Sequence, residues 1–163
     1  ETRKEKHETY SALAGFFNQY EIIYVVGDER DLIQLRTHQW MNDVYIYRTI
    51  ATPEQARRLF IDVMERVNGL HDHPEFYNTL TNNCTTNIRR HVNHVFGEKI
   101  PRDYRVLLTG YSDRLAYELG LLESAGTFEQ TRSRARVNPA AYLYGDRADF
   151  SKKIREQLQM ASR

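Results

Sequence analysis

The sequence predicts an α+β fold in which a small antiparallel sheet packs against helices. Three observations favour this class. Segments rich in β-branched and aromatic residues lie before residue 49, helical spacing of apolar residues dominates after residue 52, and strands do not alternate with helices. The length of 163 residues suits one domain, and we predict a single domain over residues 1–163.

Three early segments have the composition of strands. Residues 21–26 contain Ile, Tyr and Val and stop at a Gly-Asp turn. Residues 31–37 alternate in part, and residues 28–30 would form the hairpin connection between these two strands. Residues 43–48 alternate between aliphatic and tyrosine side chains, which indicates a third strand.

The first long helix has a clear start signal. Thr52 is suited to cap it, Pro53 to occupy its first position, and Gln55 to complete a capping box. Apolar residues follow at helical spacing, and the pair 68–69, Asn-Gly, predicts the helix end. We predict a loop over residues 70–83.

A second helix is predicted from Cys84 to Gly97, with Asn83 as its N-cap. Beyond Pro101 the chain is predicted to be mostly helical, with Asn138-Pro139 breaking the run. The predicted helical pieces of this part cover residues 113–119, residues 128–136 and a last helix from about Ser151.

Composition excludes several classes of protein. Apolar residues make up 40% and charged residues 28%, which fits a folded globular domain and excludes a disordered tail. With 23 basic and 22 acidic residues the net charge is +1, so no global charge favours nucleic acid as a partner. No apolar stretch of about 18 residues is present to cross a membrane.

Cys84 is the cysteine of this chain and its best candidate for chemistry. If Asn83 caps the helix, the sulfur lies at the helix N-terminus, where unpaired N–H groups stabilise a thiolate and can hold an oxyanion. Papain-type enzymes use such an arrangement. The alternative is an inert small side chain in the core, which is the commoner fate of a lone cysteine.

A cysteine nucleophile needs a base, and no histidine is an obvious partner. His91 follows Cys84 by seven residues, which is about 10 Å along a helix, and His94 is further away. The other histidines lie in the N-terminal run, after the second predicted strand, or in the predicted loop: His7, His38, His71 and His73.

The histidines also permit a zinc site, formed by His71, His73, His91 and His94 with Cys84. Their spacing matches no known zinc motif, and solvated histidines explain the pattern as well. We therefore predict no metal and no cofactor.

Several segments resemble the Lnb N-terminal periplasmic domain family of bacterial envelope proteins. The most specific is Phe76–Thr86, which contains Tyr-Asn followed by Asn-Cys-Thr-Thr, and the resemblance covers roughly residues 1–145. The other segments that resemble the family are Tyr10–Leu13, Tyr20–Tyr24, Asp28–Thr37 and Asp43–Tyr47.

The resemblance implies a papain-like fold of the permuted kind, related to NlpC-type peptidases and lecithin:retinol acyltransferases. It implies that Cys84 is the nucleophile and that its histidine partner lies on a strand upstream of Glu1. We therefore expect this chain to be truncated at its N-terminus and to lack the catalytic histidine.

The function that the resemblance implies is lipoprotein N-acylation in the periplasm, through a thioester on Cys84. Asn83 would cap and orient the helix, and Tyr77 and Asn78 would line the cleft. A lipid or lipoprotein would be the substrate, with membrane attachment through segments outside this chain. The alternatives are a cysteine peptidase or amidase of the same fold and a non-catalytic periplasmic binding module.

Overall fold

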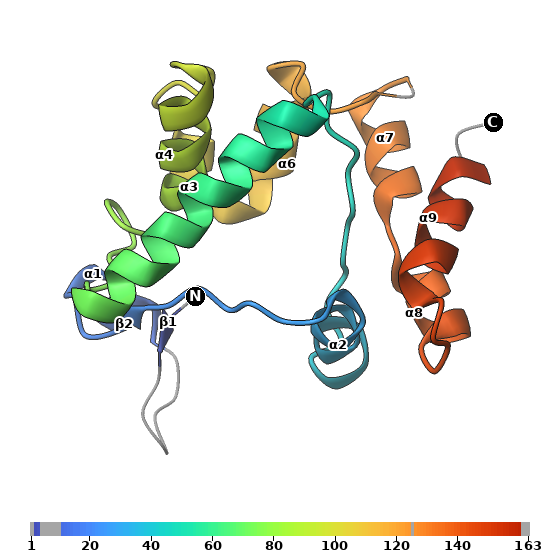
Figure 1. The fold of residues 1–163 in the computed structure, drawn as a ribbon, viewed down its shortest axis with the longest axis horizontal. Helices are drawn as coiled ribbons and strands as arrows, with labels where there is room; N and C mark the ends of the chain where they lie inside the picture. The colour runs from blue at the N-terminus through green and yellow to red at the C-terminus, as the bar shows by residue number, and fades with distance from the viewer. Residues whose placement is uncertain (1, 4–10, 125, 161–163) are drawn as a thin grey trace. The chain divides into compact units, whose positions relative to one another are not determined.

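The computed structural model describes residues 2–3, 11–124 and 126–160 of the chain. This part of the chain is mostly helical (Figure 1). Its contacts form two compact units, Glu1–Val25 with Ala51–Leu119 (unit 1) and Val26–Ile50 with Gly120–Arg163 (unit 2).

The predicted α+β fold, with a papain-like antiparallel sheet packed against the Cys84 helix, is wrong. In the described ranges the paired strands are β1 (Thr2–Arg3) and β2 (Glu21–Ile22), two residues each and antiparallel. The predicted third strand makes one isolated bridge, between Tyr45 and Arg136. In the described ranges, the strand-rich composition of these segments therefore produces one pair of two-residue strands and not the predicted sheet.

The predicted hairpin and second strand are helical, for a local reason. The side chain of Asp28 accepts a hydrogen bond from the backbone N–H of Arg30 at 2.9 Å, which caps helix α2 (Glu29–Gln34). The π-helix η1 (Leu35–Gln39) continues from it. Ile33 lies on the buried side, so a run that alternates only in part satisfies the helical period instead.

Unit 1 contains the two predicted long helices. Helix α3 (Pro53–Asp72) begins with the predicted capping box of Thr52 and Gln55 and extends beyond the predicted end. Helix α4 (Cys84–Phe96) ends before Gly97, whose φ of 76° suits glycine. The shorter helices of unit 1 are α1 (Ala12–Phe16), α5 (Tyr104–Leu107), the 3₁₀ helix η2 (Thr109–Tyr111) and α6 (Ser112–Glu118).

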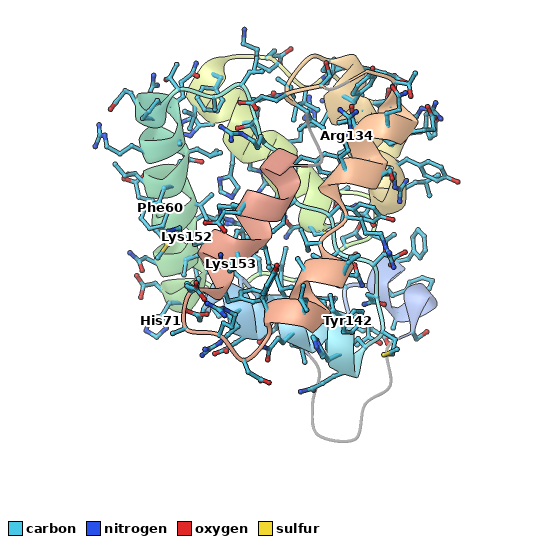
Figure 2. All side chains as sticks on the ribbon, turned by 90° about the vertical axis from the view of Figure 1, so that its right-hand side faces the viewer. Phe60, His71, Arg134, Tyr142, Lys152 and Lys153 are labelled. Atoms are coloured by element: carbon cyan, nitrogen blue, oxygen red, sulfur yellow. The ribbon has the colours of Figure 1, made fainter. Side chains whose placement is uncertain are left out.

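Helix α3 packs against α4 with no residue fully buried. Phe60 on α3 is exposed (Figure 2), with 65% of its surface open to solvent. The buried apolar cluster of unit 1 consists of Tyr20, Ile22 and Tyr77, and Leu70 of α3 packs against it. Helix α3 is thus attached to unit 1 both by partly buried apolar side chains, such as Leu70, and by polar contacts, such as that of Arg66 with Glu75.

Unit 2 contains α2, η1 and three further helices: α7 (Phe128–Ala135), α8 (Asn138–Tyr144) and α9 (Phe150–Met160). The helical run is interrupted just before the predicted break, at Arg136 and Val137, and Asn138-Pro139 begins α8. In the described part of the chain, no helix is long and apolar enough to cross a membrane. The buried cluster of unit 2 consists of Ile33, Val137, Ala140, Ala141, Phe150 and Ile154.

Candidate functional site

The helix that carries Cys84 begins as predicted. Asn83 is the N-cap, and its side chain accepts a hydrogen bond from the backbone N–H of Thr86 at 2.7 Å. The Thr86 hydroxyl in turn accepts a hydrogen bond from the backbone N–H of Asn83 at 2.7 Å. This reciprocal capping box fixes Cys84 as the first residue of a 13-residue helix.

The Cys84 side chain is exposed to solvent. Its sulfur lies 3.8 Å from the Thr85 hydroxyl oxygen. Within the described residues, this is the polar contact that the structure shows for the sulfur. In that same part of the chain, the backbone N–H groups of Cys84 and Thr85 have no hydrogen-bond acceptor. An accessible thiol thus lies beside two free donors at the positive end of a helix.

Three asparagines hold the start of α4 in place. Asn83 donates from its side chain to the Thr79 carbonyl at 2.8 Å and is 1% exposed. Asn87 donates to the Asn82 side-chain oxygen and to the Asn83 carbonyl, each at 2.8 Å. Asn82 donates to the Phe76 carbonyl at 2.9 Å. Because these amides are buried and paired, the turn before Cys84 is held firmly.

The contact described for the Cys84 sulfur involves neither Tyr77 nor Asn78. Tyr77 packs in the buried cluster of unit 1. Asn78 organises the turn before α4, since its side-chain oxygen accepts from the backbone N–H groups of Leu80 and Thr81 and its NH₂ group donates to Asn18. Their cleft-lining role stays a prediction, and the observed contacts are structural.

Four residues of unit 1 lie in contact with one another in a row. They are Tyr24, Asp62, His91 and His94, here called the imidazole chain. Nδ1 of His91 lies 2.6 Å from one oxygen of Asp62, and Nδ1 of His94 contacts the other oxygen. Nε2 of His91 lies 2.8 Å from the Tyr24 hydroxyl. His91 is 6% exposed, so the chain passes from the interior to the exposed His94.

The environment shifts the pKa of two members of the imidazole chain. Burial raises the pKa of Tyr24, against the opposing effect of the nearby Arg66 guanidinium. Burial also acts to raise the pKa of Asp62, but hydrogen bonds from His91 and His94 outweigh it and leave this pKa below its ordinary value.

Arg66 links this region to the loop before α4. Its guanidinium donates to both oxygens of Glu75, at 2.6 and 2.7 Å. These hydrogen bonds lower the pKa of Glu75. Glu75 also accepts a hydrogen bond from Asn82 at 3.2 Å, so the ion pair supports the asparagine framework under Cys84.

Sequence reasoning found Cys84, Asn83 and the spacing of His91 and His94 but missed Tyr24 and Asp62. Tyr24 is 67 positions and Asp62 is 29 positions from His91, and only the tertiary fold joins them. A usable signal was the i, i+3 histidine pair, which points two imidazoles toward one neighbouring helix.

The zinc alternative gains no support from the described residues, where no group of His, Cys, Asp and Glu has the arrangement of a metal site. His71 and His73 lie at the end of α3, exposed to solvent and not in contact with Cys84. His38 belongs to unit 2, where its ring contacts Tyr142. His7 lies outside the residues that the structure describes.

The model of the Lnb N-terminal periplasmic domain family matches residues 1–110, which include α3, α4 and Cys84. The chain belongs to this family. Membership places this Lnb-family domain in the periplasm. No curated protein and no solved structure matches the chain.

Acid is expected to destabilise this Lnb-family domain through Asp62 and Glu75, whose pKa values are both lowered in the folded state. A lowered carboxyl pKa stabilises the fold above the unfolded-state value, near 4, and this contribution is lost as pH falls through the folded-state pKa. Urea unfolding midpoints measured from pH 7 to pH 3 should fall below about pH 4.5. Glu75→Gln should flatten that decline, and an unchanged profile would contradict the assignment.

Proposed function

We propose that this periplasmic domain carries out thiol-dependent acyl transfer at Cys84, from a lipid donor to a lipoprotein amine. The Cys84 thiolate attacks the ester carbonyl carbon, the bond to the alcohol oxygen breaks, and a thioester forms. An amine then attacks the thioester, an amide forms and the thiolate leaves, and the proton that the amine loses balances the one that the departing alkoxide takes up. The donor and acceptor classes rest on the resemblance to the Lnb family, and the attack itself rests on the site.

The observation that supports this proposal is an exposed sulfur on the first residue of α4, beside two backbone N–H groups that have no acceptor among the residues the structure describes. Developing negative charge on a carbonyl oxygen is stabilised by such donors, since they are fixed before the reaction. Asn83 acts as a positioning residue, because its cap and its bond to Thr79 fix the helix start.

The proton acceptor is proposed to come from outside the contacts described for Cys84. His91 is engaged by Asp62 and Tyr24 and follows Cys84 by seven residues, which is about 10 Å along α4. The lack of an imidazole beside the sulfur, among the residues described, favours a second candidate, a non-catalytic binding module. A peptidase or amidase would share the thioester and differ in the product.

A lipid donor also requires the domain to work at a bilayer surface. We propose that segments outside this chain hold the domain at the inner membrane, as the resemblance implies. The test below therefore offers one donor in solution and one in vesicles, so that a missing membrane anchor does not hide the chemistry of the thiol.

Treatment with 4-nitrophenyl hexanoate, or with phosphatidylethanolamine vesicles, is expected to leave an acyl group on Cys84 that hydroxylamine removes. The matched control is Ser133→Cys in a Cys84→Ser background, which presents an exposed thiol in the middle of α7 instead of at a helix start. Peptide mass spectrometry should show Cys84 acylated at least ten-fold faster than this control, because only Cys84 has the N-terminal donors.

Equal acylation rates for the two thiols would contradict the proposal and leave the binding module. A primary amine added after the thioester has formed separates transfer from hydrolysis. An amide product supports acyl transfer, whereas release of the free acid alone identifies a hydrolase.

A further inference from the structure

The imidazole chain has the geometry of a proton relay that ends on an oxygen nucleophile. A carboxylate only accepts hydrogen bonds, so the proton between His91 and Asp62, 2.6 Å apart, belongs to His91 Nδ1. Nε2 of His91 is then free to accept the proton of the Tyr24 hydroxyl, 2.8 Å away. Carboxylate, imidazole and hydroxyl follow one another as in hydrolases that activate a serine.

Burial and charge keep this order. His91 is 6% exposed and the Asp62 side chain is 15% exposed, whereas Tyr24 at one end of the imidazole chain is half-buried and His94 at the other end is exposed. Arg66 and Arg90 are the cations that act on Tyr24. Their charges favour negative charge that develops on the phenol oxygen, while burial outweighs them in the resting state and leaves the pKa of Tyr24 raised.

We propose that Tyr24 is a second nucleophile of this domain, activated by His91 and Asp62 and directed at acyl esters. The proposal is independent of Cys84. As the Tyr24 oxygen attacks the carbonyl carbon, its proton passes to His91 Nε2. The ester bond to the alcohol then breaks, and the leaving alcohol oxygen takes that proton from His91 Nε2. An acyl-tyrosine forms, and His91 returns to its starting state.

A sulfonyl fluoride tests this proposal, because it forms a stable bond with an activated phenol. With phenylmethanesulfonyl fluoride, the Tyr24 oxygen bonds to sulfur, fluoride leaves, and His91 receives the proton. The experiment uses the Cys84→Ser chain, so its outcome does not depend on the thiol. Tyr104 and Tyr111 are internal controls, since they are 65% and 56% exposed and the described residues show no hydrogen bond from either hydroxyl to a histidine.

Peptide mass spectrometry is expected to show Tyr24 labelled at least ten-fold faster than Tyr104 and Tyr111. The rate at Tyr24 should rise less steeply with pH than the rates at the two controls, because His91 removes the proton, whereas an unassisted phenol reacts faster up to about pH 10. His91→Gln should reduce Tyr24 to the rate of the controls. The proposal is overturned if the labelling rates of the three tyrosines follow their exposure to solvent, or if the rate at Tyr24 rises with ionisation of the phenol as steeply as the rates at the controls. Both outcomes are measured without His91→Gln, so they count even if that variant fails to fold.

Discussion

Replacing Phe150 with alanine is expected to lower the free energy of unfolding by about 3–5 kcal/mol. Phe150 is 1% exposed and packs in the buried cluster of unit 2, next to Ile154, which is 0% exposed. The substitution removes the ring and leaves a cavity that these neighbours cannot refill without moving. Urea unfolding followed by far-ultraviolet circular dichroism measures the loss.

Leu143→Ala is the matched control for this prediction. Leu143 is also an apolar residue of unit 2, on α8, but it is 70% exposed. Its replacement should change the free energy of unfolding by no more than about 0.5 kcal/mol. If Phe150→Ala costs as little as Leu143→Ala, the cluster described for unit 2 is not the core of that unit.

The core of unit 2 also shows why residues 31–37, predicted as the second strand, form a helix instead. Ile33 packs with Val137, Ala141 and Phe150, residues more than a hundred positions later. A short apolar run whose period is ambiguous is decided by such partners, and the sequence near Ile33 contains no information about them. The local signal near Ile33 is Asp28 before a helix start, but the pair Gly27-Asp28 also has the composition of a turn.

Helix starts were predictable because their chemistry is local. Thr52 and Gln55, like Asn83 and Thr86, lie three residues apart and satisfy each other without help from the rest of the fold. Helix ends were less predictable. Gly69 tolerates a helical conformation, so α3 continues past it to Asp72.

The candidate site also has one part that local sequence predicts and one part that it does not. Cys84 at the start of α4 follows from its immediate neighbours in sequence and was predicted. The imidazole chain needs Tyr24 and Asp62, which reach His91 only after the helices have packed. A contact of this kind, between residues distant in sequence, has no signature in the composition or periodicity of a single chain.

Replacing Asn83 with alanine is expected to cost about 2–3 kcal/mol, more than an ordinary helix cap. Two hydrogen bonds are lost, one from the Thr86 N–H to the side-chain oxygen and one from the side-chain NH₂ to the Thr79 carbonyl. Since Asn83 is 1% exposed, water does not readily replace either bond.

Thr52→Ala is the matched control, because Thr52 caps α3 with the same capping box but is exposed. Its loss should cost about 1 kcal/mol, the ordinary value for a cap that water can partly replace. The urea midpoints of the two variants measure this difference, when the unfolding free energy falls with urea concentration at the same slope in both. Equal costs would mean that the Thr79 bond contributes nothing to stability.

The same substitution tests the site as well as the fold. When Asn83→Ala loosens the first turn of α4, the N–H groups of Cys84 and Thr85 lose their fixed direction, while Thr52→Ala leaves them in place. 4-Nitrophenyl hexanoate should therefore acylate Cys84 several-fold more slowly in Asn83→Ala than in Thr52→Ala, because the two N–H groups are no longer fixed to stabilise the developing oxyanion. An unchanged rate, in a variant that still folds, would mean that the helix start does not govern the reactivity of this thiol.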